Sequence, residues 1–300
     1  MILSSIENPE AFLAKLREFW NERGFPEGRP GVEIGELLEL AKSELEDSAL
    51  ISSWLTVFRE AISWCTSCFF LYEWQLLEHK NYSDNVITNV VMLSKILADA
   101  NSILLLIEGG FDSSARQITR SLSEEVDALH YLLLFPNCQR EFLSAQTTDE
   151  QNRFWFQHLA KGKARKAIRA YMEQLHDAVS FIEAIEDIQS PRLMQDKDFS
   201  ATIHPTGFIG LYTAYPNLHS GDVVQKLPGF LGNSRTSSIR TLRYSCGLLS
   251  ELVLWSEHFK IATILKPTEK DPTVIYELYS HLNLGVAAFM VALNAQGTEV

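Results

Sequence analysis

Four charged side chains recur between Asp112 and Phe135 at a spacing that places them on one face of a helix: Arg116, Arg120, Glu124 and Asp127. Residues three or four positions apart lie side by side on a helix. The stripe has arginine but no lysine, and arginine is preferred where a planar anionic group is held at two points. We therefore interpret the stripe as one wall of a polar binding pocket. The alternative is a solvated face whose ion pairs contribute about 0.3–0.5 kcal/mol each.

A second wall is predicted between Gln189 and Gly232, where prolines and glycines interrupt any long helix. Long irregular segments in a folded domain are often functional. His204 lies there directly before Pro205, and a residue before proline disfavours helical geometry. A histidine in a turn can titrate near neutral pH or hold a ligand. The alternative role for His204 is a hydrogen bond to the loop backbone.

Two short motifs resemble an uncharacterised bacterial family of all-helical proteins. The motif R-S-L-x-E runs from Arg120 to Glu124, and F-S-A-T-I-H-P-T follows further along the chain. In that family an R-S-L-x-E helix is followed by an S-x-x-x-H-P segment. The resemblance implies that Arg120, Glu124, Ser200 and His204 are the marker positions of the family. It covers only the middle of the chain, and the family has no settled activity to carry over.

A second candidate site is the R-x4-H spacing of Arg153 and His158, which resembles the R-x4–6-H motif of HEPN-superfamily ribonucleases. The resemblance implies a histidine that exchanges a proton with a ribose hydroxyl or leaving oxygen, and an arginine that stabilises the phosphate. Basic residues between Lys161 and Arg169 could follow a phosphate backbone. Phe154 departs from the family, which usually has a polar residue there. The alternative is an amphipathic helix with a basic outer face.

Cofactor and metal motifs find little support in the sequence. Trp64-Cys65-Thr66-Ser67-Cys68 has the C-x-x-C spacing, but it lies inside a helical pattern with no preceding strand. Structural zinc would need two more ligands, so we expect buried thiols there. E-x-x-H occurs once, from Glu173 to His176, which is half of a di-iron motif. Phosphate-loop, dinucleotide, nucleophile-elbow and zinc-protease motifs are missing, so we predict no cofactor and no metal.

Composition restricts the class of protein. The chain has 300 residues, 46% of them hydrophobic, and a formal net charge of −12. This charge argues against a broad nucleic-acid surface. Four cysteines in a chain of this length do not indicate a disulfide framework, and the N-terminus lacks the pattern of a signal peptide. The longest uninterrupted apolar runs are too short to span a bilayer. We expect a soluble cytoplasmic protein without a membrane segment.

The elements that must position these residues are all predicted to be helices. Ser83 is expected to cap one helix that stops at Gly109-Gly110, and Asp112 or Ser113 to cap the next, which ends before Pro136. A short connection between two helices favours an antiparallel hairpin.

Further helices are expected along the rest of the chain. Thr148 is expected to cap a helix that kinks at Gly162. Another helix is expected to run from Ser234 to about Leu265, and a last one from Asp271-Pro272 to about Asn294. We predict an all-α fold, an irregular bundle of seven to nine helices around the central antiparallel hairpin. Residues 1–30 are expected to form a helical arm packed on the main body, and residues 31–300 a single domain.

The sequence favours a ligand-binding or interaction protein, with a small molecule or a protein as its partner. Its predicted pocket is formed by Arg116, Arg120, Glu124, Asp127, Ser200 and His204. The alternative is a metal-independent HEPN-like ribonuclease in a toxin or phage-defence setting, with Arg153 and His158 as catalytic residues and RNA as partner. Whether the protein is an enzyme stays open. A homodimer is compatible with the aromatic-rich stretch from Trp54 to Trp74, although core packing explains the same residues.

Overall fold

The protein is all-α, as the sequence predicts. The computed structural model describes residues 9–24, 35, 39, 49–175 and 235–296, and these form helices and no strand. The chain divides into two compact units, Met1–Leu40 and Ala41–Val300. The first unit holds α1 (Pro9–Glu22), which ends just before Gly24 at a φ of +83°. That this arm packs on the main body stays a prediction.

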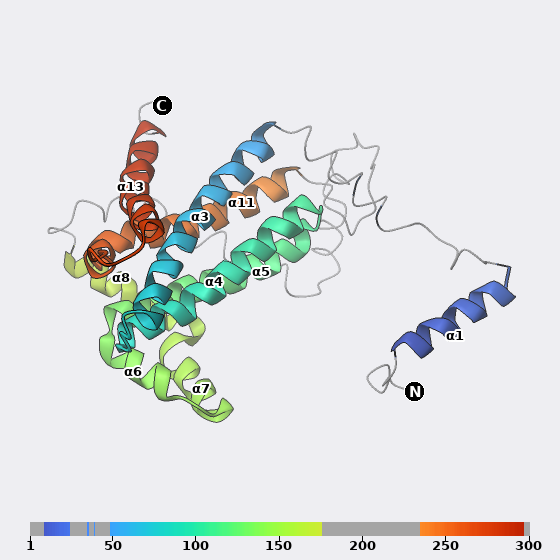
Figure 1. The fold of residues 1–300 in the computed structure, drawn as a ribbon, viewed down its shortest axis with the longest axis horizontal. Coiled ribbons are helices and arrows are strands. Elements are labelled where there is room, and N and C mark those ends of the chain that lie inside the picture. The colour runs from blue at the N-terminus through green and yellow to red at the C-terminus, as the bar shows by residue number, and fades with distance from the viewer. Residues whose placement is uncertain (1–8, 25–34, 36–38, 40–48, 176–234, 297–300) are drawn as a thin grey trace. The chain divides into compact units, whose positions relative to one another are not determined.

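The predicted hairpin lies at the centre of the second unit. It consists of α4 (Asp84–Glu108) and α5 (Asp112–Leu134), which run side by side (Figure 1). The side chain of Ser83 accepts the backbone N–H of Val86 and so caps α4, as expected. Gly109 closes α4, because its backbone N–H donates to the last free carbonyls of the helix.

Two predicted helix caps are wrong by one residue, for different reasons. Phe111 precedes α5 without a side-chain cap, because the carboxylate of Asp112 instead pairs with Arg116 one turn later, at 3.2 Å. The helix after the hairpin is capped by Thr147, not by Thr148. Glu150 decides this register, because its side chain returns to the backbone N–H of Thr147 and completes a capping box.

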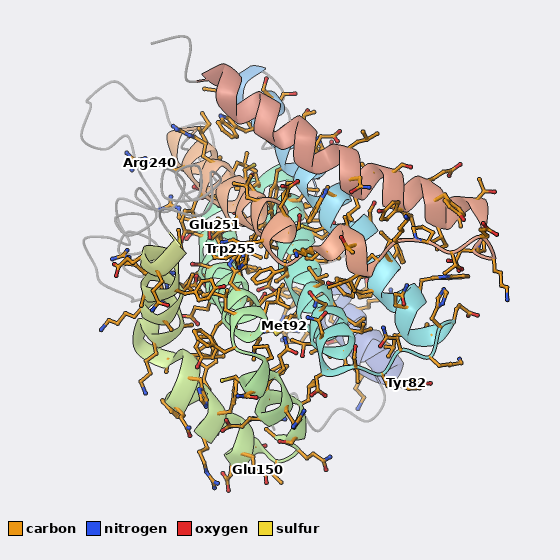
Figure 2. All side chains as sticks on the ribbon, turned by 90° about the vertical axis from the view of Figure 1, so that its left-hand side faces the viewer. Tyr82, Met92, Glu150, Arg240, Glu251 and Trp255 are labelled. Carbon is orange, nitrogen blue, oxygen red and sulfur yellow. The ribbon has the colours of Figure 1, made fainter. Side chains whose placement is uncertain are left out.

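Two further helices pack against the hairpin and complete a ring of four helices. α3 (Ala49–Leu77) packs on α4, and α11 (Arg235–His258) packs on both α5 and α3. The core lies inside this ring, where Met92 and Trp255 are buried, while Tyr82 and Glu150 project outward (Figure 2). Its largest fully buried side chains include Trp64, Trp255, Tyr72, Phe58, Ile51, Leu71, Ile96, Ile103, Leu122 and Leu129.

The segment after the hairpin is broken into short elements. They are α6 (Pro136–Ser144), α7 (Thr148–Phe154), the π-helical turn η2 (Trp155–Leu159), the 3₁₀ turn η3 (Ala160–Gly162) and α8 (Lys163–Leu175). The kink predicted at Gly162 is confirmed, with a φ of +71° that favours glycine. The π turn before it was not predicted, and α8 beyond it packs on α5.

The helix predicted to reach Leu265 is interrupted. α11 ends at His258, and Lys260 then adopts the left-handed conformation with a φ of 52°. The short helix α12 (Ile261–Ile264) follows. The last helix, α13 (Thr273–Gln296), packs on α3, and its bounds lie within about two residues of the predicted ones.

Asp271 connects the end of α3 to the start of α13. Its carboxylate accepts hydrogen bonds from Trp74 Nε1 and His79 Nε2, both at 2.9 Å, and from the backbone N–H and hydroxyl of Thr268. Desolvation acts to raise the pKa of Asp271, but these hydrogen bonds outweigh it and lower the pKa to about 2. The ionised carboxylate is therefore a fixed part of the fold.

The cysteine pair of the C-x-x-C sequence is buried in α3, as expected. Cys65 is fully buried and Cys68 is 1% exposed. Burial raises the pKa of Cys65 to about 12, so this thiol stays protonated at neutral pH.

Among the described helices, only α4 is long and apolar enough to cross a membrane by length and composition. It packs between α3 and α5, and its buried side includes Met92, Ile96, Ile103 and Ile107. A core helix of a bundle passes the same test, so this single helix is weak evidence for a membrane segment.

Gly285 on α13 lies against the ring of Trp64, whose Nε1 donates to the carbonyl of Leu282 at 3.0 Å. A Cβ at position 285 would come within 2.3 Å of Trp64 Cδ1. We expect Gly285→Ala to lower the free energy of unfolding by about 1–3 kcal/mol, because the overpacked helix must shift. Urea unfolding measures this. Leu284→Ala, at a side chain 70% exposed, is the matched control and should change stability by about 0.5 kcal/mol or less.

Candidate functional site

The polar stripe of α5 forms one wall of a real pocket. Arg120, Glu124 and Asp127 line a pocket of about 160 Å³. Arg116, predicted for the same site, does not line it and pairs with Asp112 at the start of α5. The stripe therefore contributes three of its four predicted residues to one concave site.

The opposite wall comes from the segment that holds the second candidate site. Trp155 and Leu159 belong to the π turn η2, and Arg165 to the first turn of α8. The π turn is closed by a hydrogen bond from the backbone N–H of Ala160 to the carbonyl of Trp155, five residues earlier. The other residues of this wall, Ala160, Gly162 and Ala164, are small, so the backbone of the turn comes close to the pocket.

Two arginine–carboxylate pairs in the pocket differ in how firmly they are held. Arg165 donates from Nε at 3.0 Å and from Nη2 at 2.7 Å to the same oxygen of Asp127. These two side chains are 20% and 11% exposed. The Arg120–Glu124 pair is 2.7 Å long and lies one turn apart on α5, with side chains 27% and 40% exposed. The first pair is structural, and the second lies at the solvent and can exchange partners at little cost.

A row of buried hydroxyls holds α5 in place behind the pocket. Thr119 contacts Ser245 of α11 at 3.3 Å, and Ser123 contacts Tyr244 at 3.0 Å. Ser123 also accepts a hydrogen bond from Arg165 at 3.3 Å. Hydrogen bonds between buried hydroxyls fix the register of packed helices, because a shifted register leaves them unsatisfied.

Sequence reasoning missed Arg165 and Trp155 as pocket residues. The sequence places Arg165 in a basic cluster or on a basic outer face, although its neighbours Ala164 and Ile168 are apolar residues that α8 buries against the bundle. That apolar spacing was the available signal. Trp155 carried no comparable signal, because its direction depends on the π turn.

His158 belongs to η2, directly before the pocket residue Leu159, and contacts Tyr131, which lies one turn beyond Asp127 on α5. Its Nδ1 lies 3.0 Å from the hydroxyl of Tyr131, and its Nε2 lies 3.1 Å from Glu141 Oε2. Its side chain is 14% exposed and stacks obliquely on the ring of Phe154. His158 therefore lies neither in an apolar core nor in an open cleft. Both ring nitrogens face polar partners.

Arg153 is exposed, and within the described helices no hydrogen bond joins it to His158. The HEPN-like arrangement expects these two residues to meet in a basic cleft. The hydrogen bonds and ion pairs of the described residues include no such pairing.

The remaining predicted site residues, Ser200 and His204, lie outside the described part of the chain. Whether His204 faces Arg120 and Glu124 stays a prediction.

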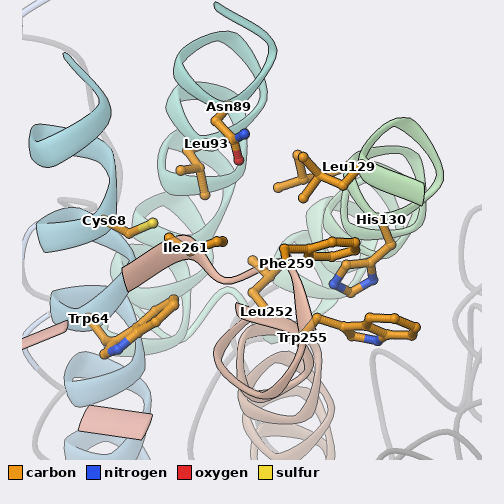
Figure 3. A pocket seen from close by; sticks show the side chains of 11 residues that line it. Trp64, Cys68, Asn89, Leu93, Leu129, His130, Leu252, Trp255, Phe259 and Ile261 are labelled. Atoms are coloured by element: carbon orange, nitrogen blue, oxygen red, sulfur yellow. The ribbon is translucent and has the colours of Figure 1, made fainter. Parts of the chain in front are cut away.

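A second, smaller cavity lies inside the helix ring, between Trp64, Leu129, His130 and Trp255 (Figure 3). Its volume of about 10 Å³ suffices for one water molecule at most. No group of three or more His, Cys, Asp or Glu side chains in the described helices is arranged to hold a metal ion.

The two ion pairs of the pocket should differ in their effect on stability. We expect Asp127→Ala to lower the free energy of unfolding by about 2–3 kcal/mol, because it removes the carboxylate that accepts two hydrogen bonds from the largely buried Arg165 guanidinium. Glu124→Ala removes an exposed partner and should cost about 0.5 kcal/mol or less. Urea midpoints of the two variants test this, and equal losses would contradict the assignment of different roles to the pairs.

Comparison with protein-family models, with curated proteins and with solved structures found no match to this chain. The resemblances to the helical family and to HEPN ribonucleases therefore stay predictions.

Proposed function

We propose that the protein binds a small polar ligand with an anionic group in the pocket between α5 and α8. The supporting observation is that Arg120, Glu124 and Asp127 line one concave site together with Arg165. If the stripe were only a solvated helix face, no other element would need to face it. The stripe is faced by η2 and α8, and α8 contributes Arg165 to the same pocket.

Arg120 is the residue that we expect to hold the anion. Its pair with Glu124 is partly exposed and of the i, i+4 kind that contributes only about 0.3–0.5 kcal/mol. A ligand carboxylate or phosphate can therefore replace Glu124 at little cost, and the guanidinium can hold it at two points. Arg165 remains bound to Asp127 and keeps the wall in place.

Trp155 indicates that the ligand carries a flat group beside its anionic group. Its side chain is 36% exposed at the pocket, which offers an aromatic face for a flat group beside the anion. The volume of about 160 Å³ favours a compact ligand over a dinucleotide or a polypeptide. We infer a small metabolite that carries an anionic group on a flat ring.

Phenyl phosphate is a suitable probe, with inorganic phosphate and phenol as its two halves. At about ten times its Kd, phenyl phosphate should stabilise the folded protein by about 1.4 kcal/mol, because it binds only the folded state. The melting temperature measures this gain, and Arg120→Gln should lose most of it. Phenol and inorganic phosphate alone should bind more weakly, since each makes half of the contacts.

Arg59→Gln is the matched control, because it removes an exposed arginine that pairs with Glu108, and neither residue lines the pocket. It should keep the full gain from phenyl phosphate. An unchanged melting temperature of the wild type up to millimolar phenyl phosphate, or an equal gain in Arg120→Gln, would contradict the proposal.

The ribonuclease remains a second candidate because of one observation. Phe156 is 62% exposed and Trp155 36% exposed, and the exposed Lys163 donates from Nζ to the carbonyl of Phe156 at 2.7 Å, so this segment carries aromatic and basic side chains at the solvent. Glu141 lies on Nε2 and the hydroxyl of Tyr131 on Nδ1, so a ribose hydroxyl would have to replace Tyr131 to give its proton to Nδ1.

This candidate predicts that purified protein cleaves bulk RNA without added metal, and that His158→Ala and Arg153→Ala each lose the activity. Product sizes on a denaturing gel measure the cleavage. Gln157→Ala, at an exposed neighbour, should cleave like the wild type. Cleavage that survives in His158→Ala would exclude His158 as the catalytic residue.

A further inference from the structure

A thiol lies beside the histidine of this segment. Cys138 Sγ is 3.5 Å from the hydroxyl of Tyr131 and 3.9 Å from His158 Nδ1. The other ring nitrogen of His158 contacts Glu141, one turn beyond Cys138 on α6. Three separate elements, α5, α6 and η2, therefore bring a nucleophile, a base and an orienting carboxylate together.

A general base must be neutral, and for a neutral His158 the contacts set the direction of the protons. The carboxylate of Glu141 can only accept, so the neutral imidazole carries its proton on Nε2 and leaves Nδ1 as an acceptor. Tyr131 must then donate to Nδ1, and its oxygen is left to accept the proton of Cys138. Burial raises the pKa of Tyr131, with a further contribution from Cys138, so the phenol stays protonated and can relay a proton.

We propose that Cys138 is a nucleophilic thiol, activated by Tyr131, His158 and Glu141, that reacts with low-molecular-weight disulfides. The thiol proton moves to Tyr131 as the tyrosine proton moves to His158 Nδ1. The thiolate attacks one sulfur of the disulfide, a new S–S bond to Cys138 forms, and the old S–S bond breaks. The departing thiolate takes the proton from the imidazolium, so one disulfide and one thiol give one mixed disulfide and one thiol.

The position of Cys138 in the fold supports this chemistry. It lies in the first turn of α6, where the helix dipole favours a negative charge. The other three cysteines, Cys65, Cys68 and Cys246, are at most 4% exposed, whereas Cys138 is half-buried. A mixed disulfide with a small molecule is therefore the expected product.

This distribution makes the experiment simple, because the native chain offers one reactive thiol. With 5,5′-dithiobis(2-nitrobenzoate) as the disulfide, native protein should release one equivalent of the coloured thiolate rapidly, and unfolded protein four. Cys138→Ser should lose the rapid equivalent. At pH 7, Tyr131→Phe and Glu141→Gln should each slow the rapid reaction about tenfold or more, because the proton path is broken.

A pH series separates activation from access. Free cysteine thiols are ionised at about pH 10, where a base no longer speeds the attack, so wild type and both variants should react at equal rates there. Tyr171→Phe is the matched control, because it removes another tyrosine–histidine hydrogen bond, to His258, and should leave the rate unchanged. The proposal is overturned if native Cys138 reacts at pH 7 no faster than thiols of the unfolded chain, or if the variants are as fast as wild type at pH 7. Equal slowing at pH 7 and pH 10 also overturns it, since access would then have changed.

Discussion

The double hydrogen bond from Arg165 to one oxygen of Asp127 is the interaction on which the candidate site depends. It joins α8 to the central helix α5 across a largely desolvated gap, at 2.7 and 3.0 Å. A planar guanidinium allows little freedom in such a contact, so the pair fixes both the distance and the rotation of α8. The pocket wall of η2 and α8 is therefore positioned by this polar contact together with the burial of Ala164 and Ile168.

The central helix α5 serves several neighbours at once, and this explains its unusual sequence. Its apolar residues Leu122, Val126 and Leu129 enter the core of the helix ring. Thr119 and Ser123 contact α11, and Asp127 contacts α8. A helix surrounded on most sides cannot show a single apolar stripe, because each neighbour requires a different chemistry. Polar residues on α5 therefore belong mostly to helix contacts, and only its outermost stripe reaches the pocket.

Much of the fold was predictable from local patterns. Ser83, Gly109 and Pro136 mark the hairpin because caps and breaks depend on neighbours in sequence. The break at Lys260 was not predictable, because lysine rarely adopts a positive φ and nothing in its neighbourhood signals one. Such a break follows from tertiary packing.

The site was predictable on one side only. Arg120, Glu124 and Asp127 are recognisable in the sequence because spacings of four and three residues place them on one face of a helix. Arg165 meets them from a different helix, and only the fold reveals that distance. The R-x4-H spacing singles out His158 as a catalytic candidate together with Arg153. Its ring nitrogens instead contact Tyr131 and Glu141, which no sequence motif relates to it.

The π turn at Trp155–Leu159 contains one residue more than an α-helical turn would need. Removal of a single residue from it would restore α-helical geometry and rotate everything beyond by about 100°, one residue's share of a turn. Arg165 would then leave Asp127, while Leu159 would leave the pocket and His158 would leave Tyr131. The number of residues in this turn, and not only their types, therefore determines the geometry of the site. Single-residue deletions in this turn should be tolerated far less than substitutions on its exposed side, and related chains that keep the pocket should keep the insertion.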